Sequence, residues 1–222
     1  MNGSKVVNIV EVFFTWITRI VYLNVLWILF TLMGLVVAGL FPATMATISV
    51  ARKWMLGDRD FSVLKTFKGF YSGSFLVSNV AGWIVASVGA LLYLNYTVLV
   101  SLGDEVFFLV PFSFYLIVFL FSVMAVWVFP LYSHYEGGLK QHLKNALIIG
   151  IGKLHYTLSI WVLLFFIVYI SLELPGIIPF FMFSMIGVCW TWITMTVLKK
   201  LDERESSEVQ GPGPAQFREQ SQ

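Results

Sequence analysis

Five long stretches of this chain contain no Asp, Glu, Lys or Arg, and they constrain the fold more than any other feature. They comprise residues 20–51, 74–100, 106–135, 154–172 and 174–198. Each has at least 19 residues, and about 20 apolar residues in an α-helix cross the roughly 30 Å hydrocarbon layer of a bilayer. A soluble helix of that length would show a polar face. The sequence therefore predicts an all-α fold, a polytopic transmembrane helical bundle.

The overall composition supports the same class of protein. Of the 222 residues, 59% are hydrophobic and only 12% are charged, whereas a soluble domain carries about 25% charged residues. The end of the chain differs, because it is polar and contains a Gly-Pro-Gly-Pro run. We therefore expect an integral membrane helical domain over residues 1–200 and a disordered cytoplasmic tail over residues 201–222.

Glycine and proline interrupt the first charge-free stretch. Pro42 in a first helical turn, with Thr44 behind it, suits a fresh helix start, so we expect a turn at residues 39–41 and a second helix over residues 42–56. Its charge-free part is about ten residues, or roughly 15 Å, which is too short to cross a bilayer alone. We predict six membrane segments, the second short or re-entrant. Five spans, with residues 20–51 crossing once, are the alternative.

The positions of Lys and Arg indicate the orientation, because short cytoplasmic loops are enriched in them. Twelve of the fourteen are expected on one side: Arg52, Lys53, Arg59, Lys65, Lys68, Lys140, Lys144, Lys153, Lys199, Lys200, Arg204 and Arg218. The turns at residues 101–105 and 173–176 contain none. The chain is therefore expected to be a multi-pass plasma-membrane protein with a cytoplasmic C-terminus. Six segments would place the N-terminus in the cytoplasm too, and five would place it outside.

Two basic stretches predict amphipathic helices on the cytoplasmic surface. In the first, Phe67 and Tyr71 share one helical face, and Lys65 and Lys68 occupy another. The second covers residues 134–153, and its histidines, His134 and His142, are interpreted as surface residues. The candidates for docking a partner or contacting lipid headgroups are Arg52, Lys53, Lys65, Lys68, Lys140 and Lys144. Topology and anionic headgroups explain these cations, so no nucleic-acid partner is expected.

The polar residues within the spans offer little for chemistry. The last four charge-free stretches hold no Asp, Glu, Lys or Arg, and coupling of an ion or proton gradient through intramembrane carboxylates therefore has little to work with. The chain also lacks His-Glu-x-x-His, a cysteine pair, a phosphate-binding glycine loop and Gly-x-Ser-x-Gly. We therefore expect no enzymatic activity, no cofactor and no metal. Asn24, Thr44 and Asn79 are candidates for a substrate path or for interhelical hydrogen bonds.

Several short sequences carry a family resemblance. They are Asn24-Val25-Leu26-Trp27, Gly39-Leu40-Phe41-Pro42-Ala43-Thr44, Ala51-Arg52-Lys53-Trp54, Gly57-Asp58 and Lys144-Asn145-Ala146-Leu147. Over residues 6–200 the chain resembles the YesL-like family of bacterial integral membrane proteins, a domain of unknown function. The resemblance implies an association with carbohydrate-uptake and polysaccharide-utilisation systems of Gram-positive bacteria. It supplies no catalytic or ligand-binding residues.

These observations lead to one expected function and one alternative. We expect an integral plasma-membrane protein without catalytic activity, an accessory or interaction component of a bacterial carbohydrate-uptake or utilisation system. Its expected partners are the lipid bilayer and other membrane proteins, such as a sugar ABC transporter or a sensor. The alternative is a small-solute transporter or facilitator subunit, because the broken helix at residues 39–42 is typical of transporter sites near the bilayer midplane.

Overall fold

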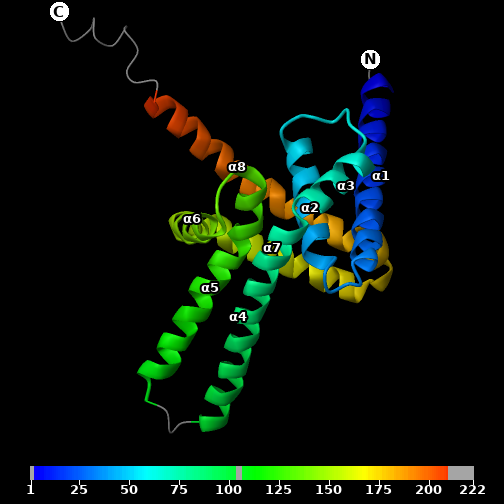
Figure 1. Ribbon diagram of the computed structural model, residues 1–222. Coiled ribbons are helices and arrows are strands. Elements are labelled where there is room, and N and C mark those ends of the chain that lie inside the picture. The colour runs from blue at the N-terminus through cyan, green and yellow to red at the C-terminus, as the bar shows by residue number, and fades with distance from the viewer. Residues whose placement is uncertain (1–2, 104–106, 210–222) are drawn as a thin grey trace, which may run out of the picture.

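The computed structural model describes residues 3–103 and 107–209, and every regular element in these ranges is a helix (Figure 1). The helices are α1 (Gly3–Met33), α2 (Leu40–Met55), α3 (Val63–Gly73), α4 (Phe75–Leu102), α5 (Leu109–His134), α6 (Leu139–Gly152), α7 (Leu154–Glu173) and α8 (Phe183–Val209). A 3₁₀ turn (Pro175–Ile177) and a π-helical turn (Ile178–Met182) precede α8. The predicted all-α fold is confirmed.

Five segments are long and apolar enough to span a membrane. They are Val7–Met33, Phe75–Leu102, Leu109–His134, Leu154–Glu173 and Pro175–Arg204. α2 has only 16 residues and is not among these five, so the structure does not decide whether it is the sixth membrane segment that the sequence predicts. The predicted polytopic bundle is therefore confirmed, and α3 and α6 are the two shorter helices between spans.

The second surface helix begins later than predicted. α5 continues through Pro130 and ends at His134, so α6 starts at Leu139 rather than at residue 134. Pro130 is buried. In apolar surroundings a proline within a helix is tolerated because neighbouring groups satisfy the backbone. Pro130 therefore does not end the span.

The chain reverses direction between α1 and α2. Gly34 and Gly39 lie back to back across the turn, and a Cβ added to Gly34 would lie 2.4 Å from the Cα of Gly39. Between them Leu35 and Val36 have φ values of 53° and 64°, a region that β-branched residues rarely adopt. The turn was predicted at residues 39–41 and instead occupies residues 34–39, because this glycine pair allows the two helix ends to approach.

The side chains of the turn are apolar and exposed. Leu35 is 85% exposed and Val37 62% exposed, whereas turns in water favour Gly, Pro, Asn, Asp and Ser. The backbone amide of Val36 donates to the carbonyl of Thr31 in α1, and that of Ala38 donates to the carbonyl of Gly34, which suits a place without water. The charge-free part of α1, residues 20–33, is about 21 Å long, less than the roughly 30 Å hydrocarbon layer. The apolar turn and the short charge-free part of α1 fit a short or re-entrant hairpin formed by α1 and α2.

α2 is the centre of the bundle. It contacts α1, α3, α4, α5 and α8, and ten of its 16 residues are buried. Glycines let two neighbours approach closely: the ring of Phe41 occupies the place of a side chain at Gly82 of α4, and Thr47 contacts Gly187 of α8. Such small-residue contacts are the usual means of close helix packing in membranes.

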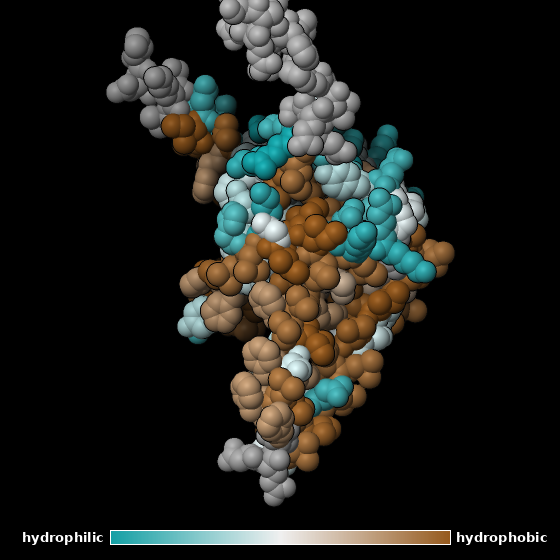
Figure 2. Space-filling model, turned by 90° about the vertical axis from the view of Figure 1, so that its left-hand side faces the viewer, coloured by the Kyte–Doolittle hydropathy of each residue, from teal (hydrophilic) through white to brown (hydrophobic). Residues whose placement is uncertain are grey.

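The molecule has a polar end and an apolar end. α4 and α5 form a hairpin that extends away from the other helices in Figure 1, and the buried residues of α4 lie near its start, at Ser78, Ala81 and Gly82. On the face in Figure 2, hydrophilic residues gather toward the upper end and hydrophobic side chains cover the lower part. α8 continues to Val209, past the predicted domain boundary at residue 200. The rest of the predicted tail, residues 210–222, lies outside the described residues.

Candidate functional site

Asn24 connects α1 to the irregular turn that precedes α8. Its side chain is fully buried. Nδ2 donates to the carbonyl oxygens of Ile178 (3.3 Å) and Pro179 (2.7 Å), and Oδ1 accepts from the backbone N–H of Ser184 at 3.0 Å. Asn24 thus hydrogen-bonds to the backbone at both ends of the π-helical turn, where the regular α-helical pattern is interrupted. The amide is therefore used internally, as an interhelical hydrogen bond.

Thr44 lies close to Asn24, on the neighbouring helix. Its Oγ1 donates to the carbonyl of Leu40 at 2.8 Å and accepts from Trp27 Nε1 at 3.1 Å. The other side of Trp27 stacks on Phe183, with the ring centroids 3.8 Å apart. Asn24, Trp27 and Thr44 thus belong to one junction of α1, α2 and the start of α8. Sequence reasoning gave no role to Phe183, because its contact depends on a residue far away in the chain.

Asn79 belongs to a different place. Its Nδ2 donates to the carbonyl of Ala38 in the α1–α2 turn and to that of Phe75 on its own helix, both at 2.9 Å. Its Oδ1 is buried and has no partner among the described residues. The structure therefore does not bring Asn79 together with Asn24 and Thr44. It holds the turn in place from α4.

Some of the predicted basic candidates are exposed, and others interact with neighbouring residues of the chain. Lys65 and Lys68 on α3, and Lys140 and Lys144 on α6, are all exposed. In Figure 1 these two helices lie to either side, α3 to the right and α6 to the left, and both lie far from the lower ends of α4 and α5. Lys53 forms an ion pair with Asp58 at 3.2 Å. Among the predicted candidates, the four exposed lysines are thus free to meet a partner or a membrane surface.

Arg52 lies beside a polar cluster that sequence reasoning missed. Its Nη1 donates to the carbonyl of His134 at 3.5 Å, and its Nε is buried without a partner among the described residues. His134 Nε2 lies 2.9 Å from a carboxylate oxygen of Asp202, and the hydroxyl of Tyr135 donates to the other oxygen. Asp202 was assigned to the disordered tail, yet it lies in α8 and pairs with the end of α5.

The prediction that His142 is a surface residue is wrong. The side chain is 1% exposed, and its ring packs edge-on against Tyr132 with the centroids 5.1 Å apart. Neither ring nitrogen has a well-formed hydrogen bond to a described residue. Burial lowers the pKa of His142, and the nearby backbone of Gly137 opposes this in part. His142 is turned inward because it lies on the same face of α6 as buried Ala146.

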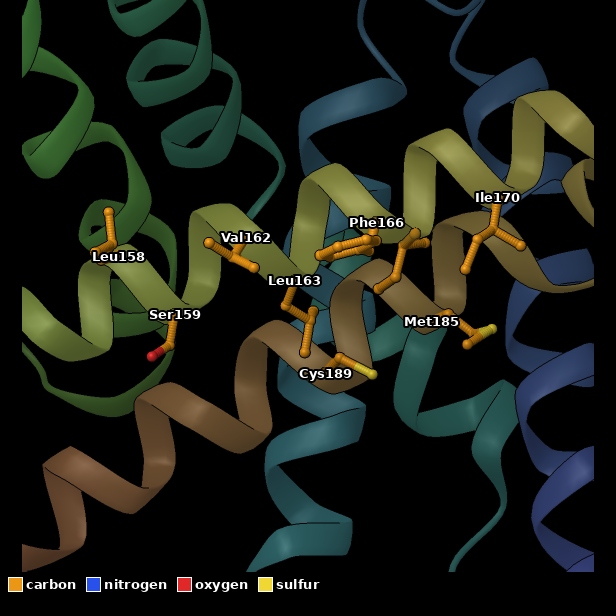
Figure 3. A pocket seen from close by; sticks show the side chains of 9 residues that line it. Leu158, Ser159, Val162, Leu163, Phe166, Ile170, Met185 and Cys189 are labelled. Carbon is orange, nitrogen blue, oxygen red and sulfur yellow. The ribbon is translucent and has the colours of Figure 1, made fainter.

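An open groove of about 560 Å³ lies between α7 and α8. Figure 3 shows Leu163 of α7 and Cys189 of α8 approaching each other across it, with Phe166 further along α7. Ser159 also lines it, but its hydroxyl donates to the carbonyl of His155 at 2.8 Å. An apolar lining of this kind suits an acyl chain or an apolar helix and offers a sugar few polar partners.

The arrangement as a whole favours structural and surface roles for the candidates. Asn24, Thr44 and Asn79 make hydrogen bonds between segments, and the exposed lysines lie on two separate amphipathic helices. Polar side chains inside a membrane domain commonly serve such interhelical contacts.

Comparison with known proteins gives similarity over most of the chain. A family described as "Protein of unknown function, DUF624" matches residues 20–96. Three proteins of Bacillus subtilis (strain 168), each described as uncharacterized, are similar to this chain. YteU is 37% identical over 86% of this chain and 86% of its own length. YesL is 31% identical over 92% of this chain and 96% of its own length. YesV is 30% identical over 84% of this chain and 89% of its own length.

No solved structure matches the chain. The similarity to YesL confirms the resemblance stated from the sequence. The chain therefore belongs to the DUF624 family of proteins of unknown function.

Proposed function

We propose that this protein is a non-catalytic plasma-membrane component that docks onto another membrane protein through its basic helices, with both termini in the cytoplasm. One observation carries the proposal: Lys65, Lys68, Lys140 and Lys144 are all exposed, while the polar residues of the spans make internal hydrogen bonds. Free cations at a membrane surface attract acidic protein surfaces and anionic headgroups. The Lys/Arg bias of the loops supports their cytoplasmic side.

The proposed partner belongs to a carbohydrate-uptake or utilisation system, such as a sugar ABC transporter or a sensor. This part of the proposal rests on the resemblance to YesL-like proteins alone. The absence of enzymatic activity is likewise proposed, and it is supported by the internal use of Asn24 and Thr44.

Site-specific photo-crosslinking in native membranes tests the docking role. A photoreactive residue placed at Lys65 or Lys144 should crosslink to a transporter or sensor subunit, identified by mass spectrometry, at native abundance. The matched control is the same residue at Leu94, which is 58% exposed on the apolar surface of α4. Crosslinks only to lipid from the lysine positions, together with recovery of the protein alone in mild detergent, would contradict docking.

A small-solute transporter or facilitator subunit is the second candidate. The observation that favours it is that two elements are interrupted: α1 packs on the π-helical turn Ile178–Met182, and α1 itself is followed by the irregular turn at residues 34–39. Interrupted helices form binding sites in transporters. Purified protein in liposomes would be tested with a panel of sugars and amino acids. Uptake abolished by Asn24→Leu would support this candidate, and no uptake of any solute would reject it.

A further inference from the structure

Two arginines surround a pair of tryptophans where α1 meets the end of α2. The rings of Trp16 and Trp54 lie edge to face with their centroids 5.9 Å apart. The guanidinium carbon of Arg19 lies 5.7 Å from the Trp16 centroid and 6.0 Å from that of Trp54. That of Arg59, from the loop after α2, lies 5.6 Å from Trp16. Both guanidinium groups are thus held by cation–π contact with the same indole.

No carboxylate balances these two charges among the described residues, because neither arginine forms an ion pair there. Of the two acids that flank Arg59, Asp58 pairs with Lys53 instead, and Asp60 forms no ion pair with either arginine. Arg19 Nη2 makes only a long contact, 3.5 Å, to the backbone carbonyl of Arg59. A guanidinium has five N–H donors that match the oxygens of a phosphate. Two such groups in contact with the same indole therefore have unused capacity for an anion.

The cluster lies at the depth expected of phospholipid headgroups. Arg19 immediately precedes the first charge-free stretch of α1, and Trp16 is one helical turn before it. Tryptophan and arginine are both enriched at the level where acyl chains meet headgroups. Beyond Arg19, α1 exposes Leu29 and Leu32, as a helix facing lipid would. The anion that reaches this place most readily is the phosphate of a lipid.

A shallow groove of about 380 Å³ begins beside Arg19. It is lined by Phe14, Thr15, Thr18, Arg19 and Tyr22 along the exposed side of α1. The threonine hydroxyls donate to carbonyls of their own helix, so their remaining lone pairs can accept hydrogen bonds. A groove with one guanidinium, hydroxyl oxygens and aromatic edges suits a headgroup that carries a phosphate and hydroxyl donors.

We propose that Arg19 and Arg59 form a binding site for the phosphate of an anionic glycerophospholipid. The bound lipid would bridge α1 and the loop after α2, and so hold the α1–α2 hairpin closed at its polar end. This site is independent of the docking role, because it uses neither of the lysine-bearing helices.

Thermal unfolding of the full chain in detergent, with added phosphatidylglycerol, tests the site. Phosphatidylglycerol should raise the Tm of the wild type in proportion to its concentration, as a ligand of the folded state does. Phosphatidylcholine and inorganic phosphate at the same concentrations should not. In the Arg19→Gln/Arg59→Gln variant the apparent affinity for phosphatidylglycerol should fall at least tenfold. An equal effect of inorganic phosphate would show a free-anion site and overturn the lipid assignment.

The matched control is Lys153→Gln/Lys200→Gln, which removes the same charge elsewhere and should keep the lipid effect. Equal losses in both double variants would show general charge attraction and overturn the site, as would an unchanged affinity in the arginine variant. If the arginine double variant does not fold, Arg59→Gln decides by the same criterion, because Arg59 is exposed and its loss removes one of the two guanidinium groups.

Discussion

Trp16 packs edge-on against Trp54, with the ring centroids 5.9 Å apart and the ring planes at 85°. Trp16 lies in the first half of α1 and Trp54 in the last turn of α2, so the contact brings the beginning of one helix beside the end of the next. Arg19 adds a contact to the backbone of Arg59. The two helices therefore form an antiparallel hairpin whose start and end lie on one side of the molecule.

Gly82→Ala should destabilise the protein, because the new Cβ would lie 2.1 Å from Cγ of Phe41 and the ring would have to move. Overpacking costs about 1–3 kcal/mol, and the better helix propensity of Ala returns about 1 kcal/mol of this. Thermal unfolding in detergent measures the effect. Gly89→Ala is the control on the same helix, since its Cβ would lie 3.6 Å from Phe121 in ordinary contact. Equal Tm values for the two variants would contradict the tight α2–α4 contact.

Asn24→Ala should lower the free energy of unfolding by about 1–3 kcal/mol, because it removes the hydrogen bonds of the buried Asn24 side chain to the carbonyls of Ile178 and Pro179 and to the backbone N–H of Ser184. Asn95→Ala is the matched control: Asn95 is exposed and donates only to Leu91 of its own helix. Chemical unfolding of both variants makes the comparison. If Asn24 instead served only a substrate path, its replacement would leave stability close to that of the control.

Lys199→Met should also destabilise the fold. Its ammonium group donates to the carbonyl of Met55 at 2.7 Å and so satisfies a carbonyl at the end of α2, where a cation also opposes the helix dipole. A hydrogen bond from a charged group contributes about 1.5–3 kcal/mol. Lys200→Met removes the same charge at an exposed position and should cost little. A loss of similar size in both variants would mean that net charge, rather than the cap, is responsible.

His142 should make stability depend on pH. Burial lowers its pKa in the folded state, so the unfolded chain takes up a proton first as the pH falls. Its contribution is complete above the unfolded pKa of about 6.5 and is lost as the pH falls below that value. The Tm of the wild type should therefore decrease between about pH 7 and pH 5.5.

His142→Phe should remove part of this pH dependence and keep or raise the Tm at neutral pH, because an apolar ring needs no hydrogen bonds in that place. His155→Phe is the control, since His155 is exposed, and it should keep the wild-type profile. A His142→Phe profile that falls as steeply as the wild type would show that other groups cause the loss.

The membrane segments could be predicted because their signal is local. A stretch without charge over 19 or more residues is visible in the chain itself, and the cost of unsatisfied backbone groups in lipid makes it helical. The hairpin turn was displaced by a few residues because its position depends on the contact between Gly34 and Gly39. Both glycines are visible in the sequence, but their packing is not.

For the candidate residues, too, local features could be predicted from the sequence and tertiary contacts could not. Asn24 was singled out as a polar residue within a span, but its hydrogen-bond partners lie more than 150 positions further along the chain. The surroundings of His142 and Asp202 were misjudged for a similar reason. A charged or basic stretch is interpreted as exposed to solvent unless its tertiary partners are known. The contacts of His142 with Tyr132 and of Asp202 with His134 cannot be inferred from spacing.

The location of the N-terminal end of α1 tests the hairpin most directly. Single cysteines at Val7, Asp60 and Ser101, each in a Cys189→Ser background, would be exposed to a membrane-impermeant thiol reagent on intact and on permeabilised cells. We expect Val7→Cys and Asp60→Cys to react only after permeabilisation, and Ser101→Cys to react on intact cells. Labelling of Val7→Cys on intact cells, with Asp60→Cys still protected, would mean that residues 20–51 cross the membrane once and would contradict the hairpin.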